Sequence, residues 1–385
     1  MSAFKDRRRF LAYSSAAVLL SGTGLKLTDA MAATHPQLKE LYSEHDNCNA
    51  VAVSSDGITF LGFPRFGKPY EAPQSVGRLE KSGKVTPFPN EEWNSWQPGK
   101  DPRNAFIAIN TIHIFNDDTL WAVDQGARAG GKAQPGAQKV VQMDVHSGKI
   151  LNIIRFNDEL LPEGSAINDL RIHGDIMYLT DSGAGAIIVY NMKTHEGLRR
   201  LAGQAIVKND AEHPLRGSGG HLLMNAKGQR TGSFCNQLEV DPSGKWFYFA
   251  PLVGPMRRVS TKDLRNPNLS EAELAKRVSE PFDIPSTNGT AMDDRGNFYV
   301  SDAEHNRILV ISPEGKRTTL VQNSRLISPD ALFIDHQRTL YIPCGQVQYT
   351  AGMNKGHYTP KLPFQVFTVQ LPHTLDGIRL GSFLG

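Results

Sequence analysis

Six polar residues stand at equivalent points of six short apolar segments, and their types suit them to act together. Each is followed by an alternating apolar run and then, about seven residues on, by a turn. Five are amides and one is a carboxylate: Asn49, Asn110, Asn168, Asn236, Asn288 and Asp330. Amides can hydrogen-bond a neutral ligand, whereas a carboxylate can attract a cation or move a proton. If the fold brings the six together, they predict one small-molecule site, with Asp330 as its catalytic residue.

A purely structural role is the alternative for these six residues. Asn and Asp at the start of a strand often bond to nearby backbone groups in Asx turns. Five more titratable residues lie near the segment starts: His113, Asp169, Arg171, His173 and Glu239. Such residues are commoner on solvated strand faces than in catalysis. Asp330 is preferred because it is the only charge among five amides, and a dry surrounding would raise its pKa.

The elements that must position these residues recur six times. Each apolar run alternates with period two, and the run after its turn carries an aromatic residue near its start or middle, as in Trp121 and Tyr178. Alternation of this kind indicates strands. The segment starts are 42 to 68 residues apart, which suits one four-stranded blade plus loops. The sequence therefore predicts an all-β, six-bladed β-propeller whose first strands line a central channel.

Residues 33–385 are expected to form this single domain. Third strands are predicted at 186–190, 256–260 and 307–311. The last repeat has no evident fourth strand after 364–370, so the segment before Asn49 is expected to supply it and close the ring. Long stretches are interpreted as loops, and a short helix is predicted within the last of them, at 270–276. These stretches are 64–105, 197–233 and 261–287.

The N-terminus has the pattern of a twin-arginine signal peptide. Arg7-Arg8-Arg9-Phe10-Leu11 precedes an apolar run that is too short to span a membrane, and Ala30-Met31-Ala32 offers a cleavage site. Such a signal directs export without anchoring the protein. We expect residues 1–32 to be removed and the mature protein to be periplasmic or extracellular.

Charge and cysteine content narrow the classes of partner. The chain has 42 basic and 39 acidic residues, and the surplus of positive charge lies in residues 1–32. The mature chain is then neutral, which argues against nucleic acid or anionic lipid as a partner. The three cysteines, Cys48, Cys235 and Cys344, are too few for a disulfide scaffold, and their odd number leaves at least one unpaired.

Several stretches resemble the major royal jelly protein/Yellow family. They include 120–126, 167–170, 178–183, 246–252 and 258–265, and the likeness is most specific between residues 170 and 265. The resemblance implies a six-bladed propeller. It also implies that the channel binds small amines or takes part in dopachrome conversion, since relatives are linked to each. A dopachrome-tautomerase-like isomerase is therefore one expectation.

A more distant resemblance is to the gluconolactonase/regucalcin family of propellers. That family holds a divalent cation, such as calcium, on the axis with a Glu, an Asn and an Asp, beside an Asn that contacts the substrate. Asn168 and Asn236 match the two Asn positions, but Asn49 replaces the Glu and Asn288 the Asp. The resemblance implies a metal-dependent lactonase, and the missing carboxylates count against it.

Three functions thus follow from the sequence. The preferred one is an exported propeller that binds, and on one hypothesis tautomerises, a small aromatic or amine compound at the channel mouth. The alternatives are a metal-dependent lactonase and a propeller that presents its loops to a protein partner without catalysis.

Overall fold

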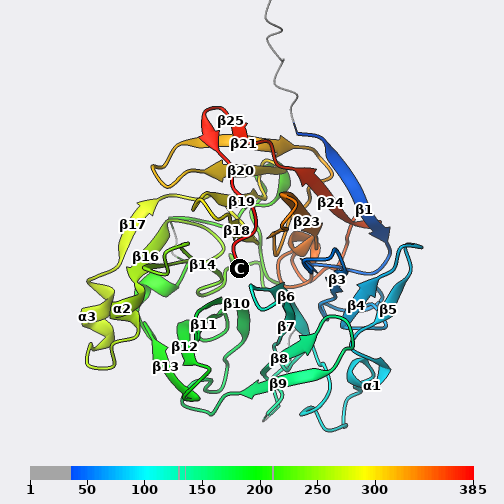
Figure 1. Ribbon diagram of the computed structural model, residues 1–385, viewed down its shortest axis with the longest axis horizontal. Coiled ribbons are helices and arrows are strands. Elements are labelled where there is room, and N and C mark those ends of the chain that lie inside the picture. Colours follow the sequence, from blue (N-terminus) through cyan, green and yellow to red (C-terminus); the bar gives the residue numbers. More distant parts are fainter. Residues whose placement is uncertain (1–35, 129–130, 135, 210–211) are drawn as a thin grey trace, which may run out of the picture. The chain divides into compact units, whose positions relative to one another are not determined.

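Six antiparallel sheets of four strands follow one another around a common axis (Figure 1). This computed structural model describes residues 36–128, 131–134, 136–209 and 212–385. The predicted signal peptide, residues 1–32, lies outside the described residues. Within the part that is described, His35–Gly385 clusters as one compact unit. The architecture confirms the predicted six-bladed β-propeller.

Each blade is one sheet, and blades 1 to 5 each contain four consecutive strands. Blade 1 comprises β2 (Ala50–Val53), β3 (Thr59–Gly62), β4 (Val76–Leu79) and β5 (Val85–Pro87); blade 2, β6 (Ile109–Ile114), β7 (Thr119–Asp124), β8 (Lys139–Asp144) and β9 (Ile150–Arg155); blade 3, β10 (Ile167–His173), β11 (Ile176–Asp181), β12 (Ala186–Asn191) and β13 (Glu196–Arg200); blade 4, β14 (Gln237–Val240), β15 (Trp246–Ala250), β16 (Met256–Ser260) and β17 (Ser279–Phe282); blade 5, β18 (Thr290–Met292), β19 (Phe298–Asp302), β20 (Arg307–Ile311) and β21 (Arg317–Gln322). The innermost strands begin within three residues of the predicted starts, and the three predicted third strands are confirmed as β12, β16 and β20.

Blade 6 joins the two ends of the described chain. It contains β22 (Phe333–Ile334), β23 (Thr339–Cys344), β24 (Phe364–Gln370) and, as its outer strand, β1 (Leu38–Glu44). Strand β1 runs antiparallel to β24, with Leu38 opposite Val369 and Glu44 opposite Phe364. The predicted closure by the segment before Asn49 is therefore confirmed. It pairs the edge that β24 would otherwise expose.

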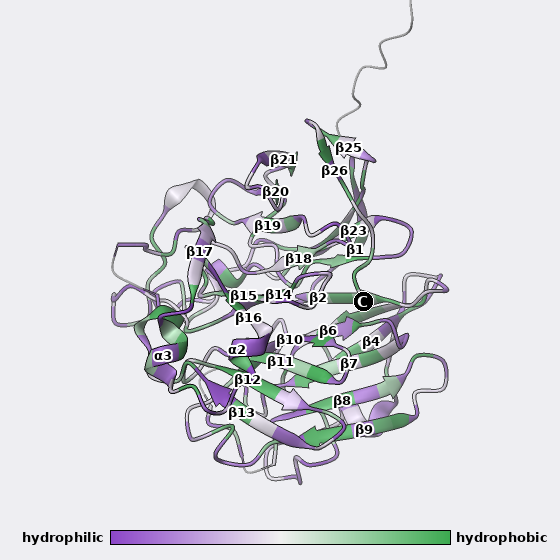
Figure 2. Ribbon diagram, turned by 60° about the vertical axis from the view of Figure 1, so that its left-hand side comes forward, coloured by the Kyte–Doolittle hydropathy of each residue, from purple (hydrophilic) through white to green (hydrophobic). Residues whose placement is uncertain are grey.

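The core lies between neighbouring blades. In blade 3, every residue of β11 after Ile176 is buried, and so is every residue of β12 before Asn191. Strands that are covered on both faces need near-continuous apolar sequence. Figure 2 shows hydrophobic stretches along the strands and mostly hydrophilic residues in the loops. This packing holds the innermost strands, and hence the residues that line the channel, in place.

All three of the predicted loops contain regular structure, and that interpretation was wrong there; residues 197–233 begin with most of β13. Residues 64–105 include β4, β5 and α1 (Glu91–Asn94), and residues 261–287 include α2 (Thr261–Leu264), α3 (Glu271–Ala275) and β17. These outer strands have only three or four residues, and those of β5 and β17 are half-buried or exposed, so alternation leaves little trace. Helix α3 was predicted, and a capping box between Ser270 and Glu273 begins it.

Two true insertions pack on each other at the end of the propeller where the innermost strands begin. One carries the short 3₁₀ helices η1 (Ala205–Val207) and η2 (Ser218–Gly220), and the other carries η3 (Val347–Tyr349). The Met224 N–H donates to Met353 O at 3.0 Å, and Met353 packs against the buried cluster of Leu215 and Leu223. No helix in the described ranges is long and apolar enough to cross a membrane.

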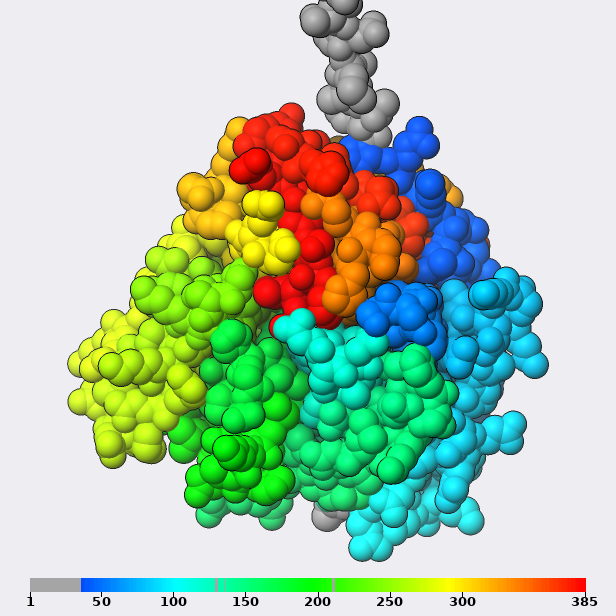
Figure 3. Space-filling view, viewed as in Figure 1, coloured from blue at the N-terminus to red at the C-terminus, as the bar shows by residue number. Residues whose placement is uncertain are grey.

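The C-terminal segment ends on the propeller axis. After a small hairpin of β25 (Thr374–Leu375) and β26 (Ile378–Arg379), the chain runs from the rim to the centre, as the red segment in Figures 1 and 3 shows. The Gly381 N–H donates to Asp293 Oδ2 at 2.6 Å, and Ser382 bonds Asp294. These bonds attach the segment to the turn that follows β18.

Candidate functional site

The fold brings the six predicted polar residues to one end of the channel, here called the amide end. All six innermost strands run in the same direction, so the residues at or just before their starts meet there. Contacts join blade to blade: Gln237 Nε2 reaches Thr287 O at 3.3 Å, and a Cβ on Gly289 would lie 2.5 Å from the Asp330 carbonyl carbon. Asn49 is buried and the other five are partly buried.

Three of the amides donate hydrogen bonds to protein groups, two of them across blades. Asn49 Nδ2 donates to Asn110 O at 3.0 Å, and Asn110 Nδ2 donates to Asn168 O at 2.9 Å. Asn168 Nδ2 donates to Ser182 Oγ at 3.3 Å, within its own blade. These bonds show that the three amide groups serve the scaffold, whatever else they bind. Asn49 Oδ1 is buried and has no partner among the described residues.

The remaining two amides are less constrained by the protein. Asn236 Oδ1 accepts from Gln237 Nε2 at 2.9 Å, which leaves its Nδ2 group without a described protein acceptor. No hydrogen bond joins the side chain of Asn288 to another described residue; its backbone N–H donates to Ser301 Oγ at 3.2 Å. Asn236 and Asn288 are therefore the amides with donors still available to a ligand.

Asp330 is the one carboxylate among the six, and its pKa is raised to about 7. Burial is the largest cause, and the nearby Asp169 carboxylate adds to it. The Ala331 N–H, 2.9 Å from Asp330 Oδ1, and the Asn49 side chain lower the pKa but do not offset the burial. No described basic side chain forms an ion pair with Asp330. A carboxyl group that titrates near pH 7 can both accept and return a proton at neutral pH.

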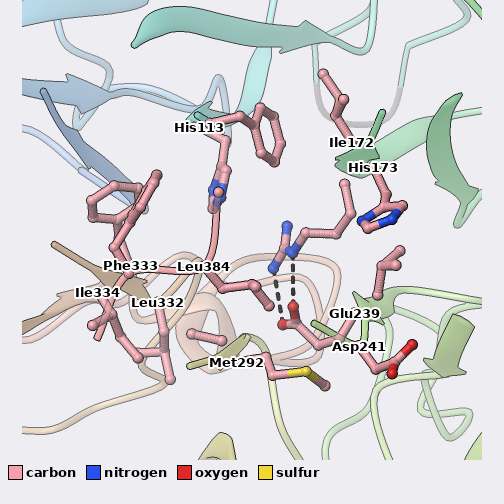
Figure 4. Close-up of a pocket in the computed structure, with 16 residues that line it drawn as sticks. His113, Ile172, His173, Glu239, Asp241, Met292, Leu332, Phe333, Ile334 and Leu384 are labelled. Atoms are coloured by element: carbon pink, nitrogen blue, oxygen red, sulfur yellow. Dashed lines mark hydrogen bonds and ion pairs between the residues drawn. The ribbon is translucent and has the colours of Figure 1, made fainter. Parts of the chain in front are cut away.

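Deeper in the channel, three of the other titratable candidates form one ion-pair network. Arg171 Nε and Nη2 donate to the two Glu239 oxygens at 2.8 and 3.0 Å, and Arg171 Nη1 lies 3.0 Å from Asp169 Oδ2. Figure 4 shows the two bonds to Glu239. Burial alone would lower the pKa of Arg171, but the two carboxylates outweigh it and raise the pKa. A guanidinium held this way stays charged, so the network is structural.

The two histidine candidates lie at the opposite end, here called the tail end. His113 and His173 line a cavity of about 30 Å³ together with Phe333, Leu384 and Gly385 (Figure 4). Burial, with a contribution from Arg171, holds the pKa of His113 well below its ordinary value, so His113 is neutral. The cavity has room for a single water molecule, not for a larger ligand.

Space for a ligand lies at the amide end instead. A cavity of about 960 Å³ opens there, over blades 2 and 3. Its lining includes Ile109 and Gln138, and the Gln138 side chain accepts a hydrogen bond from the Ile167 N–H, next to Asn168. The volume suffices for a small organic molecule. The ring of polar residues and this cavity thus occupy the same face of the propeller.

The donor set at the amide end fits a divalent cation poorly. Asp330 supplies the only carboxylate among the six ring residues, and the backbone carbonyl oxygens of Asn110 and Asn168 already accept hydrogen bonds. Calcium prefers six to eight oxygen ligands, several of them carboxylates. In the described ranges, no group of three or more His, Cys, Asp or Glu side chains is placed to hold a metal ion. The residues that surround the channel mouth therefore do not match the needs of such an ion.

Comparison with known proteins identifies the family. The family model described as Major royal jelly protein matches residues 108–371. The chain belongs to the major royal jelly protein family. A search of curated proteins found no match. The expected family, and the fold it implies, are thereby confirmed.

Solved structures add support for the fold of this major royal jelly protein family member. A gluconolactonase from Xanthomonas campestris is similar at 13% identity and a TM-score of 0.52, covering 88% of this chain and 90% of its own. A luciferin-regenerating enzyme is similar at 10% identity and a TM-score of 0.51, covering 91% and 99%. At such identities the likeness shows the propeller alone, and it agrees with the second predicted resemblance.

Sequence reasoning missed the closure of the tail end. Phe383 contacts His336, with ring centroids 4.2 Å apart, and Asn116 Nδ2 donates to Gly385 O at 3.0 Å. Phe-Leu after a short polar stretch was a weak signal that residues 383–384 pack somewhere. The three cysteines are free and buried. They lie near the amide end, because Cys48 and Cys235 directly precede Asn49 and Asn236, and Cys344 pairs with Pro329, next to Asp330.

Proposed function

We propose that this protein binds a small aromatic amine at the amide end of its channel, with Asp330 as the charged contact. The observation that carries the proposal is a partly buried carboxyl group at the channel mouth, with a pKa raised to about 7, that has no ion-pair partner among the described residues. A ligand ammonium group would supply that partner. Asn236 offers its amide donors and Asn288 its whole amide group, and a cavity of about 960 Å³, which these residues do not line, opens on the same face of the propeller.

The same group can support tautomerisation of the bound molecule. Above pH 7 the Asp330 carboxylate would take a proton from one atom of the ligand and return it to another. Atoms and electrons then balance without a co-reactant. An ideal acid–base catalyst has a pKa near the working pH, which the raised pKa of Asp330 satisfies.

Titration calorimetry with dopamine as the probe tests the binding proposal. Asp330→Asn should weaken dopamine binding about ten- to a hundredfold, because a charge-assisted hydrogen bond contributes roughly 1.5–3 kcal/mol. Binding to catechol, which lacks the ammonium group, should change little. In the unmodified protein, dopamine affinity should rise from pH 6 to pH 8 as Asp330 ionises. Equal dopamine affinity in the protein and its Asp330→Asn variant would contradict the proposal.

We further propose that the protein acts outside the cytoplasm. The twin-arginine pattern at residues 7–11 and the small residues at 30–32 support export. N-terminal sequencing of protein from the periplasm or medium should begin after Ala32. An intact Met1 on protein confined to the cytoplasm would show the opposite.

A further inference from the structure

One buried basic side chain differs from all the others in the described ranges. Arg65, Lys139, Arg171, Arg200 and Arg257 are each at most 8% exposed. Four of them have a carboxylate partner within 3.2 Å, namely Asp124, Glu239, Glu271 and Glu280 respectively. No described carboxylate lies within the 4.0 Å ion-pair limit of Arg65. A buried cation without a counter-ion is costly, so an anion from outside the chain is the natural partner.

Arg65 is held in position but not saturated. It lies in the connection between β3 and β4, at the same face as the amide end. Its Nη1 donates to Ala72 O at 2.5 Å and its Nη2 to Ser75 Oγ at 3.2 Å, while Nε has no partner. A guanidinium has five N–H donors, so three of those of Arg65 have no described partner, one of them the buried Nε.

The surroundings of Arg65 are also positive. A cleft of about 450 Å³ is lined by Arg65, Lys68 and Arg128 against a single carboxylate, Glu71. Arg128 Nη1 lies 3.0 Å from Glu71 Oε2, which neutralises one of the three cations, and Arg128 Nε has no partner. The described lining therefore carries two more positive than negative charges, and Glu71 and Asp124 act on Arg65 only from beyond ion-pair distance.

The polar amide at the back of the cleft is not available to a ligand. Asn94 Oδ1 accepts from the N–H groups of Ser75 and Val76 at 2.8 and 3.0 Å. Asn94 Nδ2 donates to Phe88 O and Asn90 O. Asn94 thus fixes the wall of the cleft, and recognition falls to the basic groups.

We propose that this cleft is a second ligand site, which binds the carboxylate or phosphate group of a small molecule with Arg65 as its anchor. The planar fork of a guanidinium matches both oxyanions, and Lys68 adds an exposed ammonium at the rim. The site is separate from Asp330, whose own charge selects cations. One face of the propeller would then carry a cation site on the axis and an anion site over blade 1.

The test is titration calorimetry of the purified protein with inorganic phosphate and, separately, citrate, at low ionic strength and neutral pH. Saturable binding of either anion is expected, and the stronger of the two reports which oxyanion the cleft prefers. Arg65→Gln should weaken that binding about ten- to a hundredfold, because it removes the charge-assisted bonds. Arg257→Gln is the matched control, since it removes an equally buried arginine that has a partner and should leave anion affinity unchanged.

Arg65 also bonds its own loop, so Arg65→Gln could fail to fold. Lys68→Ala avoids this difficulty, because Lys68 is exposed and makes no described hydrogen bond; it should weaken anion binding severalfold with an unchanged melting temperature. The proposal is overturned if neither anion binds the unmodified protein at millimolar concentration. It is equally overturned if folded Arg65→Gln and Lys68→Ala both bind as tightly as the unmodified protein. Lys68 lines this cleft but not the larger cavity over blades 2 and 3, so Lys68→Ala should leave dopamine binding unchanged and keeps the two proposals distinguishable.

Discussion

Arg171 and Asp330 both lie at the channel, but only Arg171 has side chains of opposite charge beside it. Arg171, in the middle of β10, has two carboxylates at 2.8 to 3.0 Å. Asp330, just before β22, has only a backbone N–H and an amide. The pKa of Arg171 is raised by its partners, whereas burial without a cation raises the pKa of Asp330. The buried charge deeper in the channel is thus paired within the protein, whereas the carboxyl group at the amide end has no cationic partner.

This contrast separates scaffold from site. A charge that finds its partner inside the protein has no need of a ligand, and the closed tail end leaves space only for water. A buried carboxyl group without a cation is destabilised as an ion and is favourable for a ligand that supplies one. Three substitutions and one treatment with a chelator would weaken or refine that distinction.

The largest effect is expected from removing Arg171. Arg171→Leu should lower the free energy of unfolding by about 3–5 kcal/mol, because Asp169 and Glu239 are left as unpaired, buried carboxylates. Urea denaturation measures the change. Arg277→Leu is the control: its pair with Asp263 is half-exposed, so its loss should cost less than about 1 kcal/mol. Similar losses of unfolding free energy in the two variants would mean that the buried ion pairs of Arg171 stabilise the fold no more than a surface pair does.

An effect of opposite sign is expected from Asp330→Asn. The pKa of Asp330 is raised from 3.8 to about 7 in the folded protein. Ionised Asp330 therefore destabilises the fold most above pH 7, and protonated Asp330 has no such effect below pH 4. The amide should therefore raise the free energy of unfolding at pH 8 by up to about 4 kcal/mol, and hardly at all at pH 3.5. Urea denaturation at both pH values decides it. If Asp330→Asn is less stable than the unmodified protein at pH 8, Asp330 has a structural role.

A smaller loss is expected from Asn110→Ala. This change removes the 2.9 Å bond from Asn110 to Asn168 O between blades 2 and 3 and should lower stability by about 1 kcal/mol. Asn288→Ala, at the equivalent point of blade 5 but without a described side-chain bond, should change the melting temperature much less. A larger loss of stability in Asn288→Ala than in Asn110→Ala would show that Asn288, not Asn110, stabilises the fold.

The smallest effect is expected from chelation. The ring of six polar residues has one carboxylate, so treatment with EDTA should leave both the melting temperature and dopamine binding unchanged. Elemental analysis of the purified protein complements this measurement. A large fall in melting temperature on chelation, reversed by calcium, would favour the alternative function of a metal-dependent lactonase.

Much of the scaffold could be predicted from the chain, and the failures have a common cause. The alternation after Asn110, Asn168 and Asn236 marked innermost strands, since buried strands need apolar residues at fixed period. Strands β5 and β17 were missed because short, exposed outer strands are not under that constraint. The insertion over residues 345–361 was missed as well, because loop length carries little information on where a loop packs.

The site was predictable only in part. The equivalent positions of Asn49, Asn110 and Asp330 indicated a common ring, because a propeller repeats its geometry. The different roles of these residues could not be predicted from the sequence. Asn49 and Asn110 donate hydrogen bonds to the next blade, whereas Asp330 has no cationic partner among the described residues. Nothing near Arg65 in the sequence showed that this arginine is buried without a carboxylate.

By itself, the sequence determined the six blades, the strand that closes them and the set of residues facing the axis, because periodic burial is written into each short segment. Tertiary structure alone decided which charges are paired. Glu239 reaches Arg171 from another blade, the C-terminal segment covers the tail end, and no described carboxylate comes to Arg65 or cation to Asp330. Electrostatic partners are set by distances across blades, which residue types and spacing along one chain do not encode.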